Sequence, residues 1–323
     1  MAGTAKRHHF VSKFLLAGFT QSGEVTDELW VTDFKTGKQF ARTPATTGFQ
    51  TNFHTVDIED VEPDHVEQVL AKIEGKCAPS IKAVIRDRKI PCGEAYHELI
   101  YFMALMMVKT PKARKVAEHG AGFLNKLLLK RAFRSKETWE SVQADMRNVG
   151  LEIGEDVVYE EMHDFVNSDG YDFKVDQNWI VYTMMAGAIE LMPSLVDRKW
   201  SVLCNPEGEF ICTDHPACCS FVQEVPAMWS PAPGLPHTEV QFPLSRHIML
   251  MGSLEGPAVT VQVERKHVAL FNRRALAEAE RFVYSSGKDF IWLGRDGLVK
   301  HRPDELVAAL RREPDASPPK PKS

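Results

Sequence analysis

The carboxylate of Glu74 stands where the surrounding sequence pattern is apolar. It falls within a helical pattern from Val66 to Ile85, roughly 40° from Leu70 at about 100° per residue. A buried carboxylate is costly unless a cation or a hydrogen-bond donor accompanies it. Glu74 is therefore expected either to form a structural ion pair or to line a pocket as a reactive group.

Two further candidates lie near predicted strand-rich segments far from Glu74 in the sequence. His9 precedes an apolar run that anchors it to a core, so its imidazole can serve as an acid, a base or a ligand. The alternative is a hydrogen-bonded structural histidine. Asp214 and His215 end a predicted strand, where polar side chains often form sites. The alternative for Asp214 is a hydrogen bond to its own turn.

One hypothesis combines these residues in a hydrolase that acts on a phosphate-bearing substrate such as nucleic acid. Glu74 and Asp214 would hold a divalent metal ion, Mg²⁺ or Mn²⁺, and His9 would be the general acid or base. Substrate contacts would come from three basic side chains, Lys109, Arg114 and His215. The alternative is a non-enzymatic binding or sensor protein in which the same polar residues form a structural network. The sequence leaves open whether the protein is an enzyme.

The patterns of apolar residues predict an α+β fold. Residues 1–60 are strand-rich, 62–196 helical, 199–263 strand-rich and 265–284 helical. The helical middle block is expected to pack on a mostly antiparallel sheet, built from the strand-rich segments at both ends of the chain. We expect a single domain over residues 1–312. The Pro-rich tail 313–323 is expected to be disordered.

Turn and helix signals give finer expectations. The strands Trp200–Cys204 and Glu209–Thr213 flank a turn sequence and should form a hairpin. A helix that begins at Pro111 is expected to end near Gly120, with a second helix after it. Val268–Tyr284 is expected to be one helix.

The composition is that of an ordinary globular protein. Of 323 residues, 44% are apolar and 26% are charged, and the net charge is −5. The longest apolar runs, Leu99–Val108 and Trp179–Ile189, fall short of the ~20 residues of a membrane span. We therefore expect no membrane partner. The N-terminal residues have no apolar signal core and the six cysteines form no Cys-x-x-Cys pair, so reduced thiols and a cytoplasmic location are expected. Nucleotide-binding glycine loops, the serine-hydrolase elbow and the His-Glu-x-x-His motif are absent.

The charges are unevenly distributed in the middle of the chain. Residues 109–136 contain nine Lys or Arg and one Glu, whereas residues 137–176 contain twelve acids and two bases. A stripe of charge +8 could bind the phosphate backbone of a nucleic acid. The alternative is that the basic helices are solvated or lie against the acidic segment that follows.

The segment from His8 to Phe19 resembles the opening of a bacterial family, domain of unknown function 4238 (DUF4238). Other stretches resemble that family in the same order, and the likeness covers roughly residues 8–285. These stretches are Leu29-Trp30-Val31 with Thr36-Gly37-Lys38, Lys72-Ile73-Glu74, Lys109-Thr110-Pro111, Phe210–Pro216, Phe242–Ser245, and Asn272 with Phe282-Val283-Tyr284. The chain departs from the family pattern with Ser12 for Pro, Lys109 for Arg and His215 for Asn. The resemblance implies one fold that includes His9, Glu74, Lys109 and Asp214, and it implies no activity.

Overall fold

The computed structural model describes residues 6–151, 158–223, 225–226, 229–303 and 305. The chain divides into two compact units. The first unit comprises Met1–Ala113 and Met184–Ser323, and the second comprises Arg114–Thr183. The single domain expected over 1–312 stays a prediction, and the expected tail 313–323 lies outside the described residues.

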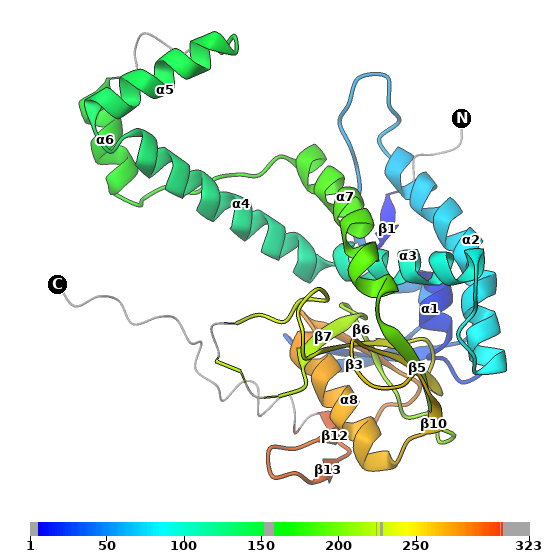
Figure 1. Cartoon of the computed structure of the whole chain (residues 1–323). Coiled ribbons are helices and arrows are strands. Elements are labelled where there is room, and N and C mark those ends of the chain that lie inside the picture. The colour runs from blue at the N-terminus through cyan, green and yellow to red at the C-terminus, as the bar shows by residue number, and fades with distance from the viewer. Residues whose placement is uncertain (1–5, 152–157, 224, 227–228, 304, 306–323) are drawn as a thin grey trace. The chain divides into compact units, whose positions relative to one another are not determined.

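A four-stranded antiparallel sheet in the first unit joins the two ends of the chain (Figure 1). Its strand order is β3-β2-β11-β6, and β11 pairs with β2 on one side and with β6 on the other. The strands are β2 (Leu29–Asp33), β3 (Lys38–Arg42), β6 (Cys212–Thr213) and β11 (Phe282–Ser285). The pairing of the N-terminal and C-terminal strand-rich segments is thus confirmed.

The five-stranded sheet of the first unit uses C-terminal strands alone, which the sequence did not predict. Its order is β10-β5-β9-β8-β7, antiparallel except for the parallel pair β10–β5. These strands are β5 (Lys199–Cys204), β7 (Cys218–Phe221), β8 (Thr238–Pro243), β9 (Ile248–Ser253) and β10 (Thr260–Gln262). Two short antiparallel pairs are β1 (Arg7–His9) with β4 (Phe49–Thr51), and β12 (Trp292–Leu293) with β13 (Val299–Lys300).

The helices complete an α+β fold, as predicted. They are α1 (Lys13–Ala17), α2 (His65–Asp87), α3 (Glu94–Val108), α4 (Pro111–Ala132), α5 (Lys136–Asn148), α6 (Tyr159–Asn167), α7 (Gln177–Val196) and α8 (Arg265–Glu278), with a 3₁₀ turn η1 (Pro44–Thr46). The central helix of the first unit is α3, in which seven apolar residues are buried. The ring of Phe102 on α3 contacts Phe14 at 4.9 Å and Phe242 of β8 at 5.9 Å between centroids. Helix α3 therefore connects the N-terminal segment to the five-stranded sheet.

Three local predictions are wrong. The expected hairpin over 200–213 does not form, because β5 pairs with β9 and β6 pairs with β11. Helix α4 runs through Gly120 without a break, since glycine lowers helix stability by only about 1 kcal/mol. The helix expected over 265–284 ends at Glu278, and Phe282–Ser285 is a strand because two neighbouring strands bind its backbone.

Helix α7 is, among the described residues, the one helix long and apolar enough to cross a membrane. In its most apolar window, 28% of the residues are buried. Core helices of soluble proteins meet the same criteria, so this is weak evidence for a membrane span. The cytoplasmic location and the lack of a membrane partner stay predictions. The six cysteines are unpaired, and all but Cys92 are buried.

The second unit has a small aromatic core of its own. The ring of Phe133, which follows α4, stacks on Trp139 of α5 at 4.3 Å, and Val166 of α6 packs beside them. On α4, Lys126 pairs with Asp172 at 2.8 Å and Lys130 pairs with Asp169 at 2.7 Å. At these residues the basic helix does lie against the acidic segment that follows, which was the alternative to a nucleic-acid surface.

Candidate metal centre

Glu74 forms the structural ion pair that was one of its two expected roles. It pairs with the ammonium of Lys109, at the end of α3. The side chains of Lys109 and Glu74 are 1% and 16% exposed. The same ammonium donates a hydrogen bond to the backbone carbonyl of His9 at 3.1 Å. Lys109 therefore ties strand β1 to helices α2 and α3.

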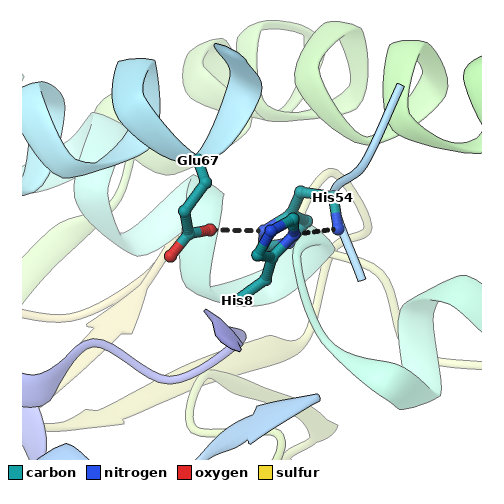
Figure 2. A group of neighbouring side chains, drawn as sticks. All are labelled: His8, His54 and Glu67. Atoms are coloured by element: carbon teal, nitrogen blue, oxygen red, sulfur yellow. Dashed lines mark hydrogen bonds and ion pairs between the residues drawn. The ribbon is translucent and has the colours of Figure 1, made fainter. Parts of the chain in front are cut away.

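A second group of polar residues was not predicted from the sequence, and Figure 2 shows its three side chains. It comprises His8 of β1, His54 in the turn after β4, and Glu67 in the first turn of α2. Nδ1 of His54 lies 2.9 Å from Oε2 of Glu67, and the backbone amide of His54 donates to Nδ1 of His8 at 2.8 Å. One potential ligand atom from each residue lies within 4.8 Å of the others. Among the described residues, this is the one His, Cys, Asp and Glu group with such spacing.

Burial sets the protonation of this group. Burial is the main cause that lowers the pKa of His54, although the hydrogen bond to Glu67 opposes the shift. Burial, the largest single cause, tends to raise the pKa of Glu67. The hydrogen bond from His54, the charges of His54 and Lys109 and the backbone amide of His9 together outweigh it, and the pKa falls below its usual range. At neutral pH, therefore, His54 is neutral and Glu67 is ionised. These are the forms in which imidazole and carboxylate bind metal ions.

Nε2 of His54 is buried and has no hydrogen-bond partner among the described residues. Buried polar side-chain atoms nearly always have a partner, so this atom needs an explanation. In the neutral ring, the bond to Glu67 places the proton on Nδ1 and leaves a lone pair on Nε2. A carboxylate that holds one nitrogen while the other faces an ion is the usual arrangement of metal-binding histidines.

The other predicted site residues have protein partners elsewhere. Asp214 accepts hydrogen bonds from the backbone amides of Glu280, Arg281 and Phe282 at 2.7–2.9 Å. Burial raises its pKa although these three donors act in the opposite direction. The structure thus brings His9, Glu74 and Lys109 together, and it gives Asp214 a separate set of partners. The proposed sharing of a metal ion by Glu74 and Asp214 stays a prediction.

Arg114 and His215 also have partners of their own. Arg114, in the second unit, pairs with Glu118 at 2.8 Å and donates to Gln177. Nδ1 of His215 lies 2.8 Å from the hydroxyl of Thr110, the residue that follows Lys109 in the sequence. These contacts do not test whether Lys109, Arg114 and His215 bind a substrate, so that role stays a prediction.

The match to a protein-family model extends over residues 7–289, most of the chain, and that family is described as a protein of unknown function, DUF4238. The chain belongs to the DUF4238 family. No curated protein and no solved structure matches it. The resemblance derived from the N-terminal motif and the motifs that follow it is therefore confirmed. Membership in the DUF4238 family assigns no activity to the chain.

One sequence signal could have found Glu67 in this DUF4238 chain. Glu67 and Glu74 are seven residues apart, so they project from α2 within about 20° of each other. The reasoning that placed Glu74 on the apolar face applies equally to Glu67. His54 lies in a turn without periodicity, and no comparable signal marks it. His8 stands directly before His9 and carries no signal of its own, although its side chain is fully buried.

The burial of His215 predicts a pH dependence of stability. Burial, reinforced by the charge of Lys112, lowers the pKa of His215 from 6.5 to about 4. Between pH 6.5 and pH 4, His215 is therefore protonated in the unfolded chain and neutral in the folded chain. The free energy of unfolding falls as the pH drops through this range. The loss due to this residue is about 3 kcal/mol at pH 4. His215→Asn, which restores the family residue and retains a partner for Thr110, should lack this part of the loss.

Urea unfolding of both proteins between pH 7 and pH 4 measures the difference. Wild type should lose more stability than the variant over this range. Parallel pH profiles would contradict the assignment of a neutral, buried His215.

Proposed function

We propose that this DUF4238 protein binds a divalent transition-metal ion through the imidazoles of His8 and His54, with Glu67 holding the ring of His54 in place. The observation that carries the proposal is the buried Nε2 of His54, which has no partner among the described residues while Nδ1 is held by Glu67. The side chains of His54 and Glu67 are 1% and 19% exposed, so water reaches the group mainly on the side of Glu67. A bound ion would supply the missing partner of His54.

The ligand types favour one class of metal. Imidazole suits Zn²⁺, Co²⁺, Ni²⁺ and Fe²⁺, whereas Mg²⁺ and Mn²⁺ prefer oxygen ligands. Two imidazoles therefore favour the first group over the Mg²⁺ or Mn²⁺ expected from Glu74 and Asp214. Because Nδ1 of His8 accepts the amide of His54, coordination by Nε2 of His8 requires the other tautomer and gives up that hydrogen bond.

The charges around the group are compatible with a divalent cation. Lys109 is the nearby buried cation that acts on both His54 and Glu67. Its charge is compensated by Glu74, to which it is bound. Glu67 therefore contributes a negative charge that the Lys109–Glu74 pair does not cancel. Attraction of a cation by one carboxylate is retained in the partly dehydrated interior.

The burial of the group favours a binding or sensor protein over an enzyme. A catalytic metal ion needs an open coordination position that substrate can reach, whereas structural metal sites are closed. His8 is fully buried and His54 nearly so. The hydrolase is the second candidate, because two protein ligands leave positions for water on a tetrahedral ion. Its substrate would be a phosphate ester, as the sequence suggests.

Metal binding can be measured directly on the full chain. Protein stripped with a chelator and titrated with Zn²⁺ by calorimetry should bind one equivalent. His54→Gln and Glu67→Gln should each weaken binding at least 10-fold, as loss of a ligand or of its orienting partner does. His267→Gln, on the exposed surface of α8, is the matched control and should bind like wild type.

Two outcomes would overturn the assignment. One is a protein that binds less than a tenth of an equivalent of Zn²⁺ and of Fe²⁺. The other is full binding by folded His54→Gln and Glu67→Gln variants. Hydrolysis of a chromogenic phosphodiester by the loaded wild type, abolished in Glu67→Gln, would favour the hydrolase over the binding protein.

A further inference from the structure

A groove runs beside the five-stranded sheet at its β10 edge, in the first unit. Its volume is about 510 Å³, and its wall includes β10, the C-terminal end of α2 and the turn after β5. All three residues of β10, which are Thr260, Val261 and Gln262, line it. Consecutive side chains of a strand point to opposite faces of the sheet. A groove that contacts all three residues therefore lies beside the strand and not over one face.

The backbone of β10 has polar groups on the side of this groove. Strand β10 ends the sheet, and its neighbour within the sheet is β5. The carbonyl of Val259 and the amide of Val263 form hydrogen bonds with β5 at 2.8 Å and 3.0 Å. Because this direction alternates along a strand, Val261 also faces β5, and the backbone groups of Thr260 and Gln262 point away from it. An extended chain beside an exposed sheet edge pairs with groups of this kind.

The charge of the groove favours an acidic ligand. Among the described residues that line it, Arg88 is the one Lys or Arg, and there is no Asp or Glu. Arg88 follows α2 and is exposed, and its guanidinium has no partner in the described part of the chain. The neighbouring Asp87 is bound by Arg86 at 2.7 Å and does not compensate Arg88. A guanidinium with free donors binds a carboxylate through two parallel hydrogen bonds.

A buried donor without a partner belongs to the same groove. Asn205 lines the groove and is 3% exposed. Its side-chain oxygen accepts the amide of Glu207 at 3.1 Å, and its backbone carbonyl accepts the amide of Gly208 at 3.1 Å. Its own amide donates to the carbonyl of His247 at 2.8 Å. The side-chain Nδ2 is the remaining polar group, and it has no partner among the described residues. Buried donors nearly always have an acceptor, and a carbonyl of a chain in the groove would supply one.

We propose that this groove binds an extended peptide segment that carries an acidic side chain and joins the sheet beside β10. The peptide backbone pairs with Thr260 and Gln262, and its carboxylate binds Arg88. Its apolar side chains contact Val261, which is 43% exposed. The groove is separate from the proposed metal centre, because Glu67 lies in the first turn of α2 and Arg88 follows its last turn. At 1.5 Å per residue, the two positions are about 30 Å apart along the helix.

Selection from a display library of random peptides of about eight residues, with the full chain as the target, tests the chemistry of the ligand. Enriched peptides should share an acidic residue flanked by β-branched or aromatic residues. The most enriched peptide, synthesised with both ends blocked, is then titrated by fluorescence anisotropy. Replacement of its acid by the amide, or Arg88→Gln in the protein, should weaken binding roughly 10-fold or more. Lys89→Gln removes the next exposed cation, which does not line the groove, and should bind like wild type.

A proline in β10 tests the pairing of the backbone. Gln262→Pro removes an amide that points away from β5, a position where edge strands tolerate proline. The variant should melt like wild type and bind the peptide roughly 10-fold more weakly or worse. In the wild-type complex, hydrogen exchange should slow at the amides of Thr260 and Gln262. A selection without an acidic consensus would overturn the proposal. Equal binding by wild type and Arg88→Gln, or by wild type and folded Gln262→Pro, would overturn it as well.

Discussion

Asp214→Ala is expected to destabilise the protein by about 4 kcal/mol. The change leaves three half-buried backbone amides, those of residues 280–282, without the carboxylate that accepts their hydrogen bonds. Each unsatisfied buried donor costs about 1–3 kcal/mol, and relief of the buried carboxylate offsets part of the sum. The segment also starts β11, so the damage is at the junction of the N-terminal and C-terminal strands. The midpoint temperature of thermal unfolding should fall by about 8 °C.

Two further variants separate this role from a general loss of charge. Asp214→Asn keeps one oxygen acceptor but brings an amide donor, so it should lose about half as much stability as Asp214→Ala. Asp289→Ala removes an exposed carboxylate after β11 and should melt like wild type. A melting temperature of Asp214→Ala within about 1–2 °C of wild type would correspond to a much smaller loss of stability. The three hydrogen bonds would then not be the main role of Asp214.

Lys109→Met should cost about 3 kcal/mol of folding stability. The variant keeps the volume of the side chain but removes the cation that Glu74 faces and the donor to His9. Removal of one partner from a buried ion pair costs more than the pair itself contributes, because the other charge is left uncompensated. Urea unfolding measures the loss.

The double variant Lys109→Met/Glu74→Leu tests this explanation. If the cost arises from an uncompensated carboxylate, removal of that carboxylate should restore most of the stability lost in Lys109→Met. Lys76 lies on α2, as Glu74 does. Lys76→Met breaks an exposed ion pair with Glu94 of α3 and should be indistinguishable from wild type. A double variant less stable than Lys109→Met would show that packing, and not charge, dominates at this position.

The success at Glu74 and the failure at the 200–213 hairpin have a common physical reason. Helical periodicity is local, so it placed Glu74 on the buried face of α2 and correctly implied a partner, although Lys109 itself is a tertiary contact 35 residues away. A turn also forms at Asn205, whose carbonyl accepts the amide of Gly208 at 3.1 Å. The strands on either side of that turn, however, find different partners, β9 and β11, which no local signal encodes.

The candidate metal centre illustrates what could not be predicted. His8 and His54 meet because β1 pairs with β4. Each of these strands has only three residues, which is too short for a periodic pattern in the sequence. Glu67 reaches them because α2 begins next to this pair, which only the folded chain shows. Asp214 was correctly recognised as a polar residue after a strand. Its partners, 66–68 residues later in the chain, could not be inferred from the turn sequence around it.

X-ray absorption at the zinc edge is the most direct test of the proposed metal centre. Wild-type protein loaded with one equivalent of Zn²⁺ should show nitrogen and oxygen ligands at about 2.0–2.1 Å, with the multiple scattering of two imidazoles. His54→Gln should lose one imidazole contribution, and Glu67→Gln, which removes the carboxylate partner of Nδ1, should lower the amount of bound zinc. A spectrum of zinc bound to water alone, or one that is identical in wild type and His54→Gln, would contradict the account.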